Sequence, residues 1–222
     1  MFRCTSSNRR GFTLIEIVIA VAIVAIFAAA ISPMVFRHLQ EAKVGKAQNE
    51  TEIIATAVLS YYKDTGAWPY TNANGPTGNT INRVISANRV AAGSGPDAAA
   101  GASNWGSYGN AKPLGDYLFY NNPDDDSSAS GNGASQNNQD WPETGALAWK
   151  GPYLESYELT DPWGNAYVIN SHYLPGGPYN GTIRHKVFVL SAGPNGRWET
   201  GFSNASPEDI QGDDIGTLIS VK

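Results

Sequence analysis

A predominantly apolar run from Phe12 to Phe36 most constrains what this chain can fold into, and Glu16 is its only charged residue. As a helix the run would extend roughly 37 Å at ~1.5 Å per residue, enough to cross a hydrocarbon core of ~30 Å. We therefore expect residues 12–36 to form a membrane-spanning helix. Any soluble domain must come from the residues that follow it.

Basic and polar residues lie directly before this run and end at Gly11. An ordinary secretory signal is cleaved after its apolar segment, whereas the layout here places the cut before it. The sequence RRGFTLIE, from Arg9 to Glu16, resembles the class III leader of type IV pilins and type II secretion pseudopilins. The resemblance implies that residues 1–11 are a leader, that a prepilin peptidase cuts between Gly11 and Phe12, and that the new amine of Phe12 is methylated.

Glu16 is costly inside a bilayer, by at least ~2.5 kcal/mol at its centre. Two local explanations reduce that cost: it lies near the membrane surface, and it lies in the first helical turn, where a negative charge suits the helix dipole. The alternative is that Glu16 neutralises the amine of Phe12 on a neighbouring subunit, because buried charges are best tolerated as a pair. The resemblance gives the matching glutamate this assembly role. Pro33 removes one backbone hydrogen bond and predicts a bend. The resemblance gives Pro33 an assembly role, since many family members have proline at this position; the alternative is an incidental kink in the membrane.

Residues 37–65 change period and carry apolar side chains on one face only, as an amphipathic helix does. The helix should stop at Asp64–Thr65–Gly66, because glycine is the usual helix terminator. Residues 66–148 read as a polar loop insert, with a short helix over Ile81–Ala92. Its centre, residues 70–140, fits either a subunit-specific surface elaboration or a disordered insertion.

Residues 149–222 predict a small antiparallel β-sheet with a C-terminal loop. Strand-forming residues occupy Tyr167–Ile169 and Lys186–Leu190, joined by turns at Gly176–Pro178 and Asn180–Gly181. The fold class is therefore α+β, with a long N-terminal helix packed on a small antiparallel sheet. This is the pilin-like arrangement that the leader also implies.

Two motifs in this region strengthen the resemblance. DPWGNAY, from Asp161 to Tyr167, resembles the DPWG hallmark of the major pseudopilin of type II secretion, and the segments 189–196 and 213–216 resemble its calcium loop. The resemblance implies a structural calcium site, and Ca²⁺ prefers six to eight oxygen ligands. The candidate ligands are Leu190, Ser191, Asn195, Asp213 and Asp214. Asn195 stands where the family usually has aspartate, and solvated turn residues are the alternative for the two aspartates.

The formal net charge is −5, and subtracting the leader arginines Arg3, Arg9 and Arg10 gives −8 for the mature chain. This acidity argues against a nucleic-acid partner. The only cysteine, Cys4, lies in the leader, so the mature chain cannot form an internal disulfide. No catalytic motif is present, and we expect no enzymatic activity.

The resemblance implies a structural pseudopilin, anchored in the inner membrane by one span, with its C-terminal domain in the periplasm. It would polymerise with itself and with minor pseudopilins into a periplasmic filament that drives type II secretion. Its other expected partners are the prepilin peptidase, the assembly platform and the assembly ATPase. One alternative is a type IV pilus pilin for adhesion, motility or DNA uptake. A second is a membrane-anchored binding protein or enzyme that uses residues 70–140 as its site.

Overall fold

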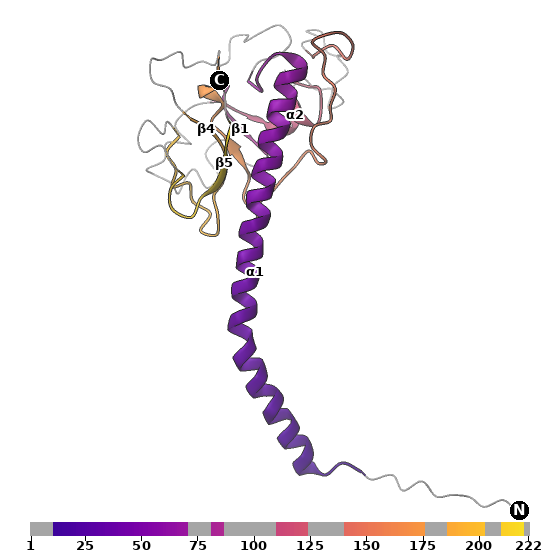
Figure 1. The fold of residues 1–222 in the computed structure, drawn as a ribbon, viewed down its shortest axis with the longest axis vertical. Coiled ribbons are helices and arrows are strands. Elements are labelled where there is room, and N and C mark those ends of the chain that lie inside the picture. Colours follow the sequence, from indigo (N-terminus) through magenta and orange to yellow (C-terminus); the bar gives the residue numbers. More distant parts are fainter. Residues whose placement is uncertain are drawn as a thin grey trace, which may run out of the picture. The chain divides into compact units, whose positions relative to one another are not determined.

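A computed structural model describes residues 11–70, 81–86, 110–123, 140–175, 186–202 and 210–219. The chain divides into two compact units, Met1–Ala42 and Lys43–Lys222. Helix α1 (Leu14–Thr65) contributes residues to both units and is the helix coloured indigo to purple in Figure 1. The predicted long N-terminal helix is confirmed.

In the first unit, α1 has no buried residue. Within the described part of the chain it is the one helix long and apolar enough to cross a membrane. Pro33 lies inside it without ending it. The large apolar side chains of residues 12–36 are all exposed to solvent: Phe12, Leu14, Ile15, Ile17, Val18, Ile19, Val21, Ile23, Val24, Ile26, Phe27, Ile31, Met34, Val35 and Phe36.

In the second unit, α1 buries one face against the domain. The buried residues follow the 3.6-residue period of a helix; they are Ala47, Thr51, Ile54, Ala55, Ala57, Val58, Tyr61 and Thr65. The helix ends at Thr65, and Gly66 follows with a φ of 74°, a left-handed conformation that favours glycine. The predicted glycine stop is confirmed, and burial on one helical face begins at Ala47, within the segment predicted to be amphipathic.

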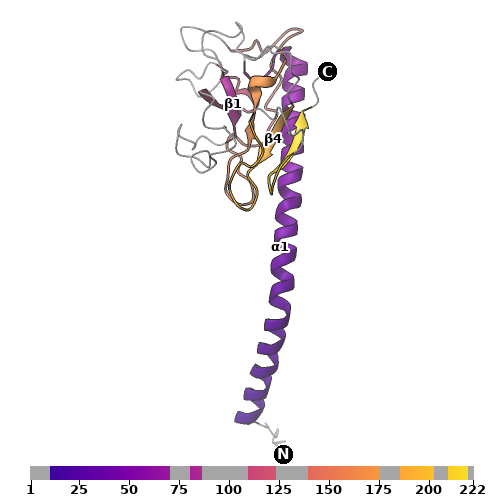
Figure 2. The same cartoon turned by 90° about the vertical axis from the view of Figure 1, so that its left-hand side faces the viewer.

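Within the described residues, one sheet contains five strands: β1 (Ile81–Ile85), β2 (Asn110–Pro113), β3 (Val168–Ile169), β4 (Val187–Ser191) and β5 (Ile215–Ile219). Their order is β2-β1-β3-β4-β5. In Figure 2, β4 and β5 lie beside the second half of α1. The side chains of Thr51 and Thr217 confirm this contact, with their hydroxyl oxygens 2.8 Å apart.

The sheet corrects two of the sequence-based predictions. It is mixed rather than antiparallel, because β1 pairs with β2 in parallel while the β1–β3, β3–β4 and β4–β5 pairs are antiparallel. The helix predicted over Ile81–Ala92 is wrong at residues 81–85, which form β1, and residues 87–92 lie outside the described part. Val84 and Ile85 pair with Ile169 and Val168, so long-range pairing decides their conformation.

The segment predicted as a polar loop insert also contributes to the core. It supplies β1, β2 and the short helix α2 (Leu114–Leu118), whose residues are all buried. The turns predicted at Gly176–Pro178 and Asn180–Gly181 lie outside the described residues.

Tyr61 organises the core at the end of α1. It is fully buried, makes edge-on ring contacts with Tyr117 and Tyr153, and accepts a hydrogen bond of 2.6 Å from Nε1 of Trp141. Burial raises the pKa of Tyr61 far above its usual value. Through Tyr61, the C-terminal end of α1 therefore contacts residues 117, 141 and 153, which follow it at different distances along the sequence.

Candidate functional site

The first candidate site is the start of α1. Gly11 and Phe12 precede the helix, and the Phe12 side chain is 84 % exposed. The predicted scissile bond therefore lies outside regular structure in an exposed segment. An exposed segment outside regular structure is accessible to a peptidase, which is compatible with the predicted cut.

Glu16 closes a capping box with Thr13. Its Oε2 accepts hydrogen bonds from the Thr13 backbone N–H and hydroxyl, both at 2.9 Å, while Glu16 N donates to Thr13 Oγ1 at 3.3 Å. This reciprocal pattern satisfies backbone donors at a helix start. The T-x-x-E spacing from Thr13 to Glu16 is the local sequence signal of this capping box. Glu16 therefore has a local partner within one chain, and any pairing between subunits has to compete with it.

The second candidate site is built around Asp161 of the DPWGN turn. Asp161 is only 4 % exposed. Its carboxylate accepts from the backbone N–H groups of Trp163 at 3.0 Å and Asn165 at 2.7 Å, and from Asn165 Nδ2 at 3.2 Å. Gly164 has a φ of 91°, so a glycine suits the turn. The predicted turn is confirmed. Asp161 is the residue that accepts the hydrogen bonds of the backbone N–H groups within it.

Asp161 also joins this turn to the end of β4. The hydroxyl of Ser191 donates to Asp161 Oδ2 at 2.6 Å, and Asn165 Nδ2 contacts the carbonyl of Gly193 at 3.2 Å. A Cβ atom on Gly193 would lie 2.1 Å from the carbonyl oxygen of Asp213. The structure therefore brings together the two segments that the sequence analysis singled out separately.

The predicted calcium ligands divide into two groups. Ser191 and Asn195 use their side-chain oxygens inside the protein, because Ser191 bonds to Asp161 and Asn195 Oδ1 accepts from Arg197 N at 2.6 Å. Leu190 lies in β4, where it pairs with Gly216. No feature of the side chains of these three residues points to a cation.

Asp213 and Asp214 behave differently. One oxygen of each carboxylate is satisfied: Asp213 Oδ2 accepts from Asn195 N, and Asp214 Oδ2 accepts from the N–H groups of Glu199 and Thr200. The other oxygen of each, Oδ1, is buried without a hydrogen-bond partner. Buried carboxylate oxygens are costly unless they are paired or coordinate a metal. Two such oxygens on adjacent residues are compatible with a cation.

The negative charge around Asp213 and Asp214 also favours a bound cation. Burial raises the pKa of Asp214 to about 6, and burial also raises the pKa of Asp213. Glu199, whose Oε2 accepts from Asp213 N at 2.7 Å, adds negative charge beside both. Across the described segments, however, no group of three or more His, Cys, Asp or Glu side chains could hold a metal. Two carboxylates and backbone carbonyls would have to complete a calcium site.

Comparison with known proteins gives one family match and several relatives. The prokaryotic N-terminal methylation motif matches residues 6–32, which include Gly11, Phe12 and Glu16. The fimbrial protein EcpC of Eikenella corrodens is 36% identical over 74 residues, covering 33% of this chain and 48% of the relative. The type II secretion system core protein G of Pseudomonas aeruginosa is 40% identical over 78 residues, covering 32% and 55%. The type IV major pilin protein PilE1 of Neisseria gonorrhoeae is 40% identical over 67 residues, covering 30% and 31%.

The chain thus spans about half the length, or less, of the curated relatives it matches. No solved structure matches the chain. The similarity supports a pilin-like N-terminal segment. The secretion-system protein and the type IV pilin are equally identical to this chain, so the comparison does not distinguish between the two roles.

Proposed function

We propose that this chain, which carries the N-terminal methylation motif of type IV pilin-like proteins, is a structural pseudopilin that polymerises into a periplasmic filament for type II secretion. The observation that carries the proposal is the exposed apolar surface of α1 from Phe12 to Phe36, directly behind the processing motif. Apolar surface gains about 25 cal/mol per Å² when removed from water. Lipid would cover this surface before assembly, and neighbouring copies would cover it afterwards.

The domain favours a secretion subunit over a pilus subunit. The sequence of the DPWGN turn resembles the hallmark of the major pseudopilin, and in this structure the turn is bonded to Ser191. The mature chain also has no cysteine and so no internal disulfide, since Cys4 lies in the leader. The similar identity of a Neisseria type IV pilin favours the alternative, a pilus subunit for adhesion, motility or DNA uptake.

A deletion experiment separates these two functions. Removing the gene and restoring it at its native level should abolish and then recover export of folded proteins, with no long surface filaments visible by electron microscopy. Surface filaments at native expression, with unchanged export, would favour the pilus subunit and contradict the secretion role.

The proposal extends to partners and location. Phe12 would face the cytoplasmic side of an inner membrane, and the domain from Lys43 onward would lie in the periplasm. A prepilin peptidase would process the chain, an assembly platform and a cytoplasmic ATPase would extract it from the membrane, and minor pseudopilins would share the filament. The chain itself would catalyse no reaction.

Replacing Gly11 with alanine should block maturation. The peptidase would have to accept a methyl group at the residue before the cut, in a segment where the structure shows no other contact for that methyl within 4 Å. The predicted effect is therefore on peptidase recognition and not on folding. Intact mass spectrometry of the membrane fraction should show the leader retained. A mature mass equal to that of the wild type would contradict the assigned cut.

We also propose that Asp213 and Asp214 hold a structural calcium ion together with nearby backbone carbonyls. The two buried, unsatisfied Oδ1 atoms support this assignment. When bound, calcium would join the segments 193–196 and 213–214 by ionic contacts in place of a disulfide. Ser191 and Asn195 would support the loop through their own hydrogen bonds.

Chelation should therefore destabilise the domain. At a calcium concentration of 100 times Kd, binding stabilises by about 2.7 kcal/mol, so EGTA should lower the Tm of a fragment lacking residues 1–36 by about 5–10 °C. Added calcium should restore the Tm. The matched variant Asp214→Asn, which keeps an oxygen for the Glu199 and Thr200 N–H groups, should lose the EGTA effect. An unchanged Tm of the wild-type fragment in EGTA would contradict the proposed calcium site.

A further inference from the structure

A groove lies along the solvent side of α1 in the second unit. It has a volume of about 370 Å³. Residues of α1 line it, together with one residue from the segment after α2: Asn49, Glu52, Ile53, Thr56, Ala57, Ser60 and Tyr153. Of the helical residues that line it, Ala57 belongs to the buried face of α1 and forms the floor side of the groove, whereas the others do not belong to that face.

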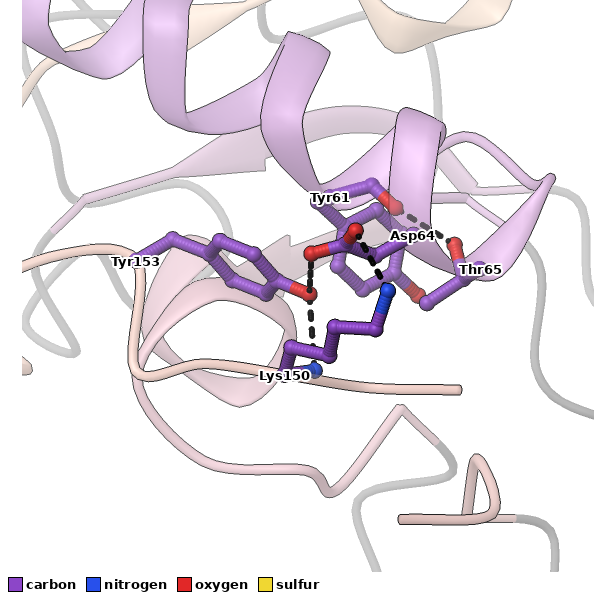
Figure 3. Close-up of polar contacts among 5 residues, drawn as sticks. All are labelled: Tyr61, Asp64, Thr65, Lys150 and Tyr153. Atoms are coloured by element: carbon purple, nitrogen blue, oxygen red, sulfur yellow. Dashed lines mark hydrogen bonds and ion pairs between the residues drawn. The ribbon is translucent and has the colours of Figure 1, made fainter. Parts of the chain in front are cut away.

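The outer wall of the groove is held in place by hydrogen bonds. Figure 3 shows the Tyr153 hydroxyl between Asp64 and Lys150: it donates to Asp64 Oδ2 at 3.1 Å and accepts from Lys150 N at 3.0 Å. Lys150 Nζ also pairs with Asp64 Oδ1 at 3.3 Å. A wall fixed in this way needs little ordering when a partner binds, which favours association.

The groove presents one apolar and one acidic group. Ile53 is 49 % exposed, although it is a large apolar side chain. Glu52 accepts a hydrogen bond from Gln48 at 3.4 Å, and it forms no ion pair within the residues that the structure describes. The surface is therefore complementary to an apolar side chain next to a basic one.

The chain itself carries such a surface further towards its N-terminus. Phe36, Leu39 and Lys43 follow one another at spacings of three and four residues on α1, which places them on one helical face. Phe36 and Leu39 are exposed, and Lys43 forms no ion pair among the described residues. We call these three residues the basic stripe.

We propose that the groove receives the basic stripe of a second copy of this chain, with Leu39 against Ile53 and Lys43 beside Glu52. This inference rests on the proposed polymerisation and adds the domain surfaces that make the contact. Because groove and stripe are different surfaces, the contact is heterologous and leaves one groove and one stripe free at the ends. Such contacts generate open helical filaments when the rotation does not close a ring.

Charge reversal in the full-length chain tests the pairing, with filaments assembled in cells that contain the processing and assembly machinery. Lys43→Glu and Glu52→Lys should each weaken subunit addition by about three- to tenfold, the range for a partly exposed ion pair that becomes repulsive. The double variant should recover to within about twofold of the wild type. Glu155→Lys, a reversal of an exposed carboxylate outside the groove, should have no effect.

Cysteine cross-linking gives an independent readout, because Cys4 in the leader is the only natural cysteine. In filaments of the double variant Leu39→Cys/Ile53→Cys, oxidation should give a ladder of covalent oligomers. Each single variant, and the pair Val44→Cys/Ile53→Cys, should give no ladder. Filaments that form normally but show neither charge rescue nor cross-linking would overturn this inference and leave the groove to another partner, while the proposed function would stand. Absence of filaments from the wild-type chain would overturn both.

Discussion

Replacing Glu16 with glutamine is expected to leave a processed, membrane-inserted subunit that adds to a filament more than about a hundredfold more weakly than the wild type. The reason is the proposed pairing of the Glu16 carboxylate with the amine of Phe12 on a neighbouring copy. Removing one partner of a buried ion pair costs about 3 kcal/mol or more, and 1.4 kcal/mol is a tenfold change in affinity. Quantitative filament pelleting, with immunoblotting of the membrane fraction for unassembled subunit, measures the change.

Because Glu16 also forms the capping box, a change to glutamine tests the charge more specifically than a change to alanine, which would remove the charge and the cap together. Glutamine can still accept from Thr13, because capping boxes admit Gln at this position. Glu16→Gln therefore removes the charge and keeps the helix start. The complementary control is Thr13→Ala, which removes the cap at a cost of about 1 kcal/mol and keeps the charge; it should still assemble. Normal filaments from Glu16→Gln, or an equal defect in Thr13→Ala, would show that Glu16 acts only within its own helix.

The features that the sequence predicted correctly are those with local signals. The apolar run, the one-sided period after it and the glycine at 66 lie within a few residues of the structure they specify, and α1 follows them from Leu14 to Thr65. The β-branched residues of β3 and β4 are a similar local signal. Such patterns depend on neighbouring residues alone and can be read without the rest of the fold.

The features that were missed depend on distant partners. Val84 and Ile85 form a strand because they pair with Ile169 and Val168, more than 80 positions away, and no local pattern reports that pairing. The hydroxyl of Ser191, a candidate calcium ligand by residue type, bonds to Asp161, 30 residues earlier. Residue type suggested oxygen chemistry at this position, but only the fold shows which partner uses the oxygen.

Asp161→Ala is expected to destabilise the domain by about 3 kcal/mol or more. The carboxylate is buried and accepts four hydrogen bonds, from two backbone N–H groups and from the side chains of Asn165 and Ser191. Alanine would leave these donors buried without their acceptor. Each hydrogen bond to a charged group contributes about 1.5–3 kcal/mol, and unsatisfied buried donors cost more than the mean bond contributes.

Urea unfolding of the fragment lacking residues 1–36, followed by tryptophan fluorescence, measures this loss. Asp161→Asn should lose about 1–2 kcal/mol, because its remaining carbonyl oxygen can still accept from the N–H groups of Trp163 and Asn165. Glu158→Ala, which alters an exposed carboxylate three residues earlier, should stay within about 0.5 kcal/mol of the wild type.

A double-mutant cycle with Ser191→Ala then isolates the bond between the turn and β4. Residues in one hydrogen-bond network show coupling energies of about 0.5–3 kcal/mol, so the loss in the double variant should be smaller than the sum of the single losses. Additive losses would show that Asp161 stabilises only its own turn. In that case the bond from Asn165 Nδ2 to the Gly193 carbonyl would be a remaining side-chain connection between the turn and segment 193–196. Coupling of the expected size would make Asp161 the residue that connects the turn to these segments.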